Sequence, residues 1–224
     1  MTYELEKSIW TEDDYEQMGW HDNFVHKIIM HKDLLLDLDY IFKWNKPEVE
    51  GMGFTFWISP ATLCFHKIKD LNLDIDVLFD GAFEIEDIEK VESTEGMHWT
   101  IITQHGEISF LSEGYTQFIR QQPTLEYRQF IPFGDRGGLS VEFTTSQPNP
   151  YLLTEQYKEQ RSREADLYNH SKNYHHYKLS LDILRKKRDD GEIQTKEFLV
   201  QKKELSSMIE GYRLLLKGTL FEPR

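Results

Sequence analysis

Two segments of the chain alternate between apolar and polar residues with a period of two. In the first, one side carries Leu34, Leu36, Leu38 and Tyr40, and the other side carries Leu35, Asp37, Asp39 and Ile41. In the second, one side carries Leu71, Leu73, Ile75 and Val77, and the other side carries Asn72, Asp74 and Asp76. Because successive strand residues face opposite sides, both segments predict strands with an apolar inner face and an acidic outer face.

Further apolar runs predict additional strands separated by short turns. These runs are Val25–Met30, Phe54–Ile58, Thr62–His66, Phe83–Val91, His98–Thr103, Glu107–Leu111 and Leu139–Thr144. A turn at residues 31–33 should join the first run to the strand after it. Pro60 should mark a break, a bulge or a sheet edge, because it has no backbone N–H. Tyr115–Arg120 reads as a short helix, and the glycine-rich residues 133–138 as a mobile turn. The pattern favours an antiparallel β-rich domain, either a sandwich or a strongly curved sheet.

The composition changes after Pro148 and Pro150. No Gly or Pro occurs from Tyr151 to Arg188, which predicts a long helix with a possible break near residues 169–173. Gly191 is suited to a left-handed helix cap, and Thr195 should open a second helix. We therefore expect an α+β protein with a β-rich domain at residues 1–147 and a helical hairpin at residues 151–224.

The second helix carries an apolar stripe. Its members are Phe198, Leu205, Met208, Ile209 and Tyr212. A two-helix hairpin buries such a stripe poorly by itself. The hairpin should therefore dock on the β-rich domain or pair with a second copy of the chain, and we expect the stripe to serve oligomerisation.

The charge of the chain is unevenly distributed. Residues 1–150 hold 27 acidic and 11 basic residues, a net charge of −16, whereas residues 151–224 hold 12 acidic and 15 basic residues, a net charge of +3. An acidic surface repels phosphates, which argues against nucleic-acid binding, and suits a basic protein partner. No apolar run is long enough to span a membrane, and the first residues do not resemble a signal peptide. With a single cysteine, Cys64, the composition leads us to expect a cytoplasmic protein.

The acidic pairs Asp37/Asp39 and Asp74/Asp76 are the main candidates for a site. As outer-face residues they would be solvated or would contact a protein partner, and we take all four as partner-binding candidates. If their two strands were neighbours, four carboxylates could instead bind a hard cation or divide acid and base roles, assisted by His21. Cys64 and His66 share a strand face, so a Cys/His pair is geometrically possible, but packing of Cys64 is the simpler expectation. We expect no catalytic residue, metal or cofactor.

Two resemblances add to these expectations. The segment Asp189–Phe198, followed by Lys202, Lys203 and Leu205, resembles the short bacterial C-terminal helical-hairpin domains called SHOCT. That resemblance implies oligomerisation or partner docking. The segments Trp20–His26, Leu34–Ile41 and Phe56–Leu63 resemble an uncharacterised bacterial β-rich family that is similar to immunity proteins of toxin systems.

Together, these features predict a non-catalytic protein-binding protein. It would neutralise a basic bacterial toxin through an acidic sheet face, where complementary charge favours fast and specific association. A metal-dependent or hydrolytic enzyme built on the strand carboxylates is one alternative. An oligomeric scaffold assembled through the hairpin is the other.

Overall fold

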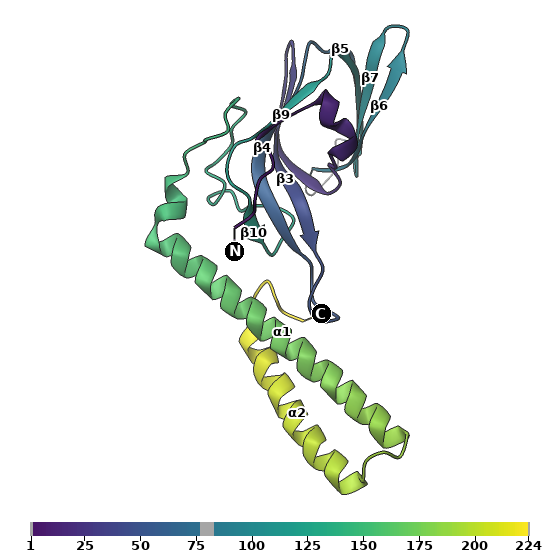
Figure 1. The fold of residues 1–224 in the computed structure, drawn as a ribbon, viewed down its shortest axis with the longest axis vertical. Coiled ribbons are helices and arrows are strands. Elements are labelled where there is room, and N and C mark those ends of the chain that lie inside the picture. Colours follow the sequence, from purple (N-terminus) through teal and green to yellow (C-terminus); the bar gives the residue numbers. More distant parts are fainter. Residues whose placement is uncertain (1, 77–82, 224) are drawn as a thin grey trace. The chain divides into compact units, whose positions relative to one another are not determined.

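The computed structural model describes residues 2–76 and 83–223, so Val77 of the second alternating segment lies outside the described residues. The chain forms two compact units. One comprises the residues up to Asn45 together with Phe54–Leu152, and the other comprises Lys46–Gly53 together with the residues from Leu153 onward. The first unit contains an antiparallel sheet and the second a pair of helices, which confirms the predicted α+β class (Figure 1).

Within the described residues, the sheet unit has ten strands and a short 3₁₀ helix, η1 (Glu12–Gln17), and a second 3₁₀ helix, η2 (Pro150–Leu153), spans the boundary between the two units. The strands are β1 (Ile9–Thr11), β2 (Asn23–Met30), β3 (Leu34–Asn45), β4 (Thr55–Phe65), β5 (Lys69–Ile75), β6 (Glu84–Ser93), β7 (Gly96–Thr103), β8 (Gly106–Ser112), β9 (Tyr115–Ile119) and β10 (Thr124–Glu126). Their order is β1-β9-β4-β3-β2-β6-β7-β8-β5, and β10 pairs with β4 beside β9. The sheet is strongly curved, as Figure 1 shows.

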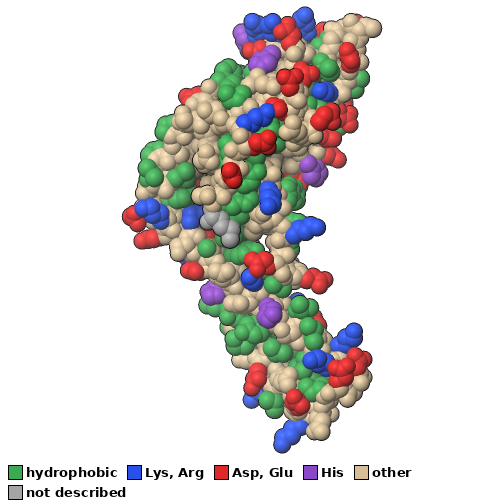
Figure 2. Space-filling view, in the orientation of Figure 1, with side chains coloured by type: hydrophobic (Ala, Val, Ile, Leu, Met, Phe, Trp, Pro, Cys, Tyr) green, Lys and Arg blue, Asp and Glu red, His purple; other side chains and the backbone are tan. Residues whose placement is uncertain are grey.

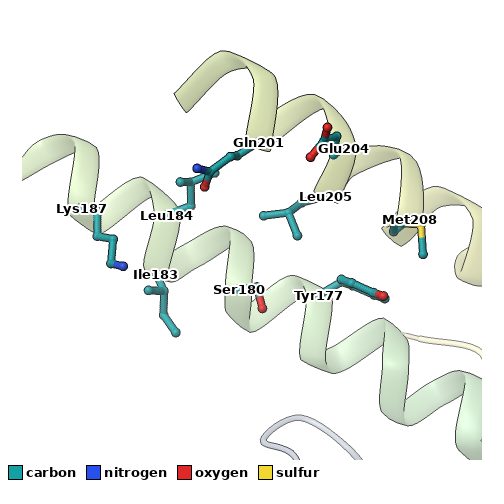
Figure 3. A pocket seen from close by; sticks show the side chains of 9 residues that line it. All are labelled: Tyr177, Ser180, Ile183, Leu184, Lys187, Gln201, Glu204, Leu205 and Met208. Atoms are coloured by element: carbon teal, nitrogen blue, oxygen red, sulfur yellow. The ribbon is translucent and has the colours of Figure 1, made fainter. Parts of the chain in front are cut away.

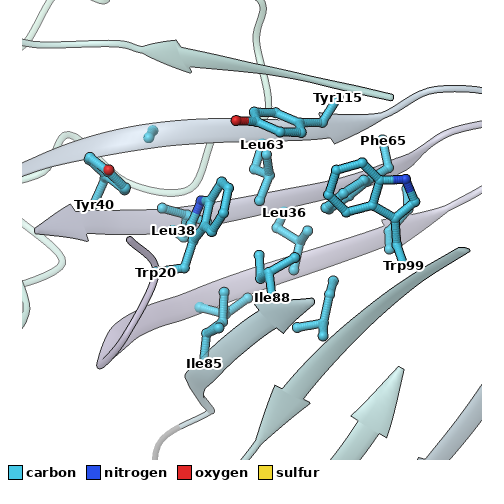
Figure 4. Close-up of a cluster of buried hydrophobic side chains, with 14 of the residues drawn as sticks. Trp20, Leu36, Leu38, Tyr40, Leu63, Phe65, Ile85, Ile88, Trp99 and Tyr115 are labelled. Atoms are coloured by element: carbon cyan, nitrogen blue, oxygen red, sulfur yellow. The ribbon is translucent and has the colours of Figure 1, made fainter. Parts of the chain in front are cut away.

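The curved sheet encloses one large hydrophobic core. Alternate residues of the strands point inward, including Leu36 and Leu38 of β3, and large aromatic side chains such as Trp20 and Trp99 fill the space between them (Figure 4). Each fully buried side chain of this kind contributes about 1.5–3 kcal/mol to folding. The alternation in the sequence therefore predicts the inner face of β3 correctly, whereas in the second alternating segment Leu71 and Ile75 pack on the core and Leu73 is 47% exposed.

Two predicted elements are wrong. The predicted helix over residues 115–120 is absent: Tyr115–Ile119 forms strand β9, in which Tyr115, Gln117 and Ile119 face the core with the period of a strand. Leu139–Thr144 forms no strand, and its backbone is irregular.

Pro60 does not break strand β4, which continues from Thr55 to Phe65. On one side of β4 the neighbour is β10 up to Ile58 and β9 from Ala61 onward. The missing N–H of Pro60 falls at the joint between these two partners, where the ladder changes strand anyway. The proline therefore costs the sheet little.

The helical unit contains α1 (Glu155–Asp189) and α2 (Thr195–Leu216), which pack against each other. Helix α1 is continuous through residues 169–173, so the suggested break is absent. Gly191 has a φ of +75°, which confirms the left-handed residue after α1, and Gln194 precedes α2 as its N-cap while Thr195 is its first residue. None of the helices in the described residues has the length and apolarity that crossing a bilayer requires.

The tip of the β3–β4 hairpin, Lys46–Gly53, belongs to the helical unit. Glu48 in this tip forms an ion pair with Lys172 of α1. Gly51 has a φ of +90°, and a Cβ atom at this position would lie 2.8 Å from Nδ1 of His175. The sequence gives no sign that residues between two strands belong with helices that begin a hundred residues later.

Candidate functional site

Asp37 is the centre of a buried ionic network on the outer face of β3. Its Oδ1 accepts hydrogen bonds from Arg120 Nη2 and Arg136 Nη2, each at 2.6 Å. Its Oδ2 accepts from Arg136 Nη1 and from the backbone N–H of Ser140, each at 2.9 Å. The carboxylate is fully buried, and its four hydrogen bonds occupy both oxygens.

Asp39, two residues further along the same face, extends this network. Oδ1 accepts from Arg136 Nε at 3.1 Å, while Oδ2 lies 2.8 Å from His26 Nε2 and accepts from the backbone N–H of Ile131 at 2.8 Å. The Arg136 guanidinium thus bridges two carboxylates, and such bidentate, charge-assisted contacts are the strongest hydrogen bonds that proteins make. All of these Asp and Arg side chains are fully buried.

Charge pairing makes this burial possible. Burial alone would raise the pKa of Asp37, but the guanidinium groups of Arg136 and Arg120 hold that pKa below its ordinary value of 3.8. Burial lowers the pKa of Arg120, against the opposing effect of Asp37. A buried ion pair adds little net stability relative to apolar residues, but removing one partner leaves an uncompensated buried charge. The network therefore pins the segment that supplies Arg136 onto the sheet.

The prediction that Asp37 and Asp39 lie on a solvated face, open to a partner, is wrong. The irregular segment after β10 covers this side of the sheet and supplies Arg136, Ser140 and Ile131 to it. Arg136 lies in the glycine-rich residues 133–138 that read as an ordinary turn. A single arginine in this glycine-rich stretch was the available signal, but the sequence does not indicate which carboxylate that arginine meets.

The four carboxylates do not cluster. Strands β3 and β5 are separated in the sheet by β2, β6, β7 and β8, so Asp74 lies far along the strand order from Asp37. His21 is exposed and stacks on Trp44, with Nδ1 2.9 Å from the carbonyl oxygen of Glu86. The geometry therefore gives no support to a catalytic or cation site made from both acidic pairs.

Asp74 does lie at the surface, within a wider acidic face. It stands directly opposite Glu107 of β8, Glu107 stands opposite Ile102 of β7, and Ile102 stands opposite Asp87 of β6. Glu89 lies two residues after Asp87 on the same face of β6, opposite Thr100 of β7. We call Asp74, Asp87, Glu89 and Glu107 the acidic face, and all four side chains are exposed. Figure 2 shows acidic side chains gathered over this part of the sheet unit. Asp76 is also exposed, but it lies just beyond the end of β5.

A second polar cluster lies at the other end of the outer face of β3 and β4. Sγ of Cys64 is 3.5 Å from Nδ1 of His66, and Nε2 of His66 is 2.8 Å from Oγ1 of Thr116. Asp33 completes the cluster: one ligand atom from each of Asp33, Cys64 and His66 lies within 4.8 Å of the others. Burial, with a contribution from Asp33, raises the pKa of the Cys64 thiol to about 11. The Cys/His pair that the sequence allowed is therefore formed, but with a thiol that is a poor nucleophile.

The apolar stripe of α2 is used largely within the hairpin. Phe198 is buried against Leu181 and Leu184 of α1, and Leu205 and Ile209 pack on the same cluster. Tyr212 stacks on Tyr177, with ring centroids 5.8 Å apart. Met208 remains 42% exposed. It lines a groove of about 610 Å³ between the helices (Figure 3), beside Ile183, Lys187 and Glu204. Docking of the stripe on α1 explains why a two-helix unit can be compact.

Neither a protein family, nor a curated protein, nor a solved structure matches this chain. The resemblances to hairpin domains and to immunity proteins therefore stay predictions.

Proposed function

We propose that this chain is a non-catalytic protein-binding protein whose acidic face meets a basic protein surface, in the manner of an immunity protein that neutralises a basic toxin. The observation that carries this proposal is the cross-strand pair of Asp74 and Glu107. Like charges placed directly opposite each other destabilise a sheet. A charged arrangement that costs stability is expected where a partner of opposite charge relieves it.

The shape of the face supports the proposal. Four neighbouring strands, β5, β8, β7 and β6, present their outward side chains to solvent, with the carboxylates of the acidic face around Ile102 and Thr100. Charge at the rim of an interface accelerates encounter and selects partners, and the centre of an interface is typically poor in charge, as Ile102 and Thr100 are here. Asp37 and Asp39 take no part, because Arg120 and Arg136 already neutralise them.

The test compares two triple variants as baits. The first replaces Asp74, Asp87 and Glu107 by Lys. The control replaces three exposed acidic residues that are not part of the acidic face, Glu4, Glu159 and Glu192, by Lys and changes the net charge equally. We expect wild type and control to capture a basic protein that the face variant binds at least about tenfold more weakly.

Titration calorimetry of the captured protein at two salt concentrations completes the test. Binding to wild type should weaken as salt rises, because salt screens exposed charges, and the face variant should lose that dependence. Equal loss of binding in the control variant would show that net charge, not this face, attracts the protein. Unchanged binding in the face variant would refute the proposal.

Self-association through the hairpin is a second candidate function, favoured by the groove beside Met208. The groove contains both a cation, Lys187, and an anion, Glu204. In a two-fold pairing each copy presents the same patch, so Lys187 of one copy can approach Glu204 of the other. Two hairpins paired in this way would form a four-helix bundle.

Light scattering over a range of concentrations tests this second candidate. Met208→Glu should reduce the mass to that of one chain, because it places a charge in the groove. Leu199→Glu adds the same charge at a residue of α2 that is 57% exposed and does not line the groove, so it should leave the mass unchanged. A wild-type mass equal to one chain at every concentration would end the idea.

A further inference from the structure

The polar side chains of four residues lie together on one side of the sheet: Asp33, Cys64, His66 and Thr116. Cys64 and His66 are two residues apart at the end of β4, so they point to the same side. Thr116 of β9 stands directly opposite Cys64, and Leu35 of β3 stands opposite Cys64 on the other side. Asp33, in the turn before β3, lies beside Cys64 and His66.

The histidine is held in the orientation that a metal ligand requires. The hydrogen bond between Nε2 and Thr116 Oγ1 at 2.8 Å fixes the ring, and in the tautomer in which Nε2 donates to Thr116 the lone pair of Nδ1 is directed at Cys64. Metal-binding histidines almost always have their second ring nitrogen bonded in this way, which sets the tautomer and the ring plane. Thr116 is thus a positioning residue for His66.

Asp33 is also oriented. Its Oδ1 accepts a hydrogen bond from the backbone N–H of Lys67 at 2.7 Å, immediately after His66 in the chain. This bond ties the turn before β3 to the end of β4. It also holds the Asp33 carboxylate beside the thiol and the imidazole, where all three ligand atoms lie within 4.8 Å of one another.

The distances between the ligand atoms suit one small metal ion that is intermediate between hard and soft. Two ligands at about 2.3 Å (thiolate) and about 2.0–2.1 Å (imidazole) from a tetrahedral zinc lie about 3.5 Å apart. The Cys64 Sγ to His66 Nδ1 distance is 3.5 Å. Thiolate, imidazole and carboxylate together are donors typical of zinc rather than of magnesium or calcium.

We propose that Cys64, His66 and Asp33 form a binding site for a divalent zinc-like ion, with the fourth coordination position open to water or to another ligand. Cys64 is buried, whereas His66 and Asp33 are half-buried, so solvent reaches the ion from the imidazole and carboxylate side. The thiol proton leaves to solvent when the sulfur coordinates the ion. The proposal does not depend on the acidic face, which lies on β5–β8.

Cobalt(II) titration of tag-free protein tests the site directly. Cys64 is the single cysteine of the chain, so a thiolate-to-cobalt charge-transfer band can arise from no other residue. We expect this band to saturate at one ion per chain and to disappear when zinc is added. Cobalt that binds without the band, or fails to bind, would overturn the proposal and leave an S–H···N hydrogen bond between Cys64 and His66.

Substitutions distinguish the three proposed ligand residues from a histidine that does not belong to the site. Cys64→Ser should abolish the band, and His66→Gln and Asp33→Asn should each weaken zinc binding measured by competition with a chelating dye. His98→Gln, on the outer face of β7, should bind zinc as wild type does, with circular dichroism confirming the fold of every variant.

Thr116 provides a finer check on the same geometry. Thr116→Val should weaken zinc binding about 10–100-fold, and Thr116→Ser should restore it, because serine keeps the hydroxyl that orients His66. Equal zinc affinity of the valine and serine variants would contradict the assigned role of Thr116. The wild-type cobalt spectrum needs no variant and decides the proposal even if a variant fails to fold.

Discussion

Asp37 on β3 and Asp74 on β5 occupy equivalent places in two similar sequence patterns, yet they have opposite environments. Asp37 alternates with leucines that are buried in the core, and Asp74 lies between Leu73, which is 47% exposed, and Ile75, which packs on the core. Asp37 is fully buried beneath Arg120 and Arg136, whereas Asp74 is exposed opposite Glu107. The alternation determines the face on which a residue lies. A distant segment decides whether that face meets solvent.

Substituting Asp37 should produce the largest change in the free energy of unfolding. Asp37→Asn leaves the Arg120 and Arg136 guanidinium groups buried with one negative charge fewer, and should cost about 3–5 kcal/mol of unfolding free energy. Urea denaturation followed by tryptophan fluorescence measures it. Asp74→Asn, the matched change at the exposed position, should not lower the urea midpoint and should raise it slightly, because it relieves the repulsion with Glu107. Equal effects at the two positions would contradict the difference in burial.

Acid unfolding separates the loss of charge from a simple loss of packing. Because the pKa of Asp37 is lowered in the folded state, its contribution is complete above the ordinary value of 3.8 and is lost as the pH falls below that value. Wild type should therefore take up about one proton more than Asp37→Asn on unfolding in this range. Parallel stability curves for the two proteins below pH 4 would show that Asp37 is not held as an ion.

The smallest change in the free energy of unfolding is expected at the acidic face, where a substitution should stabilise the protein and not destabilise it. Asp74→Thr removes the repulsion with Glu107 and introduces a residue that favours strands, so it should stabilise the protein by about 0.2–1 kcal/mol. Thermal unfolding measures the gain, and Asn72→Thr on the same face of β5 controls for strand propensity. A gain no larger than that of the control would mean that the Asp74–Glu107 pair costs nothing.

Local pattern was sufficient for most of the sheet and for the hairpin of helices. The β2–β3 turn, the inner face of β3 and the left-handed Gly191 follow from alternation and from the conformational freedom of glycine. Strand β9 was missed because its short segment, with Tyr115 and Gln117 both inward, reads equally well as one helical turn. Short apolar runs are ambiguous in this way, and pairing with β1 and β4 resolves the ambiguity.

The candidate sites could be predicted less completely from the sequence than the sheet, because tertiary structure brings their residues together. Cys64 and His66 could be paired from their spacing within one strand, but Asp33 and Thr116 join them only through the strand order. Arg136 reaches Asp37 across 99 residues of sequence, through a segment with no regular structure. No periodicity describes such a segment, so nothing in the sequence indicates which carboxylate it covers.

The tip of the β3–β4 hairpin has a consequence for the order of events during synthesis. Glu48 is 124 residues ahead of its partner Lys172 in the chain. At roughly 5–20 residues per second, a ribosome needs roughly 6–25 s to deliver that partner. Strands β3 and β4 can pair during this interval, but residues 46–53 have no helix to pack on until α1 emerges. The helical unit is therefore completed last, although one of its segments is among the first to be made.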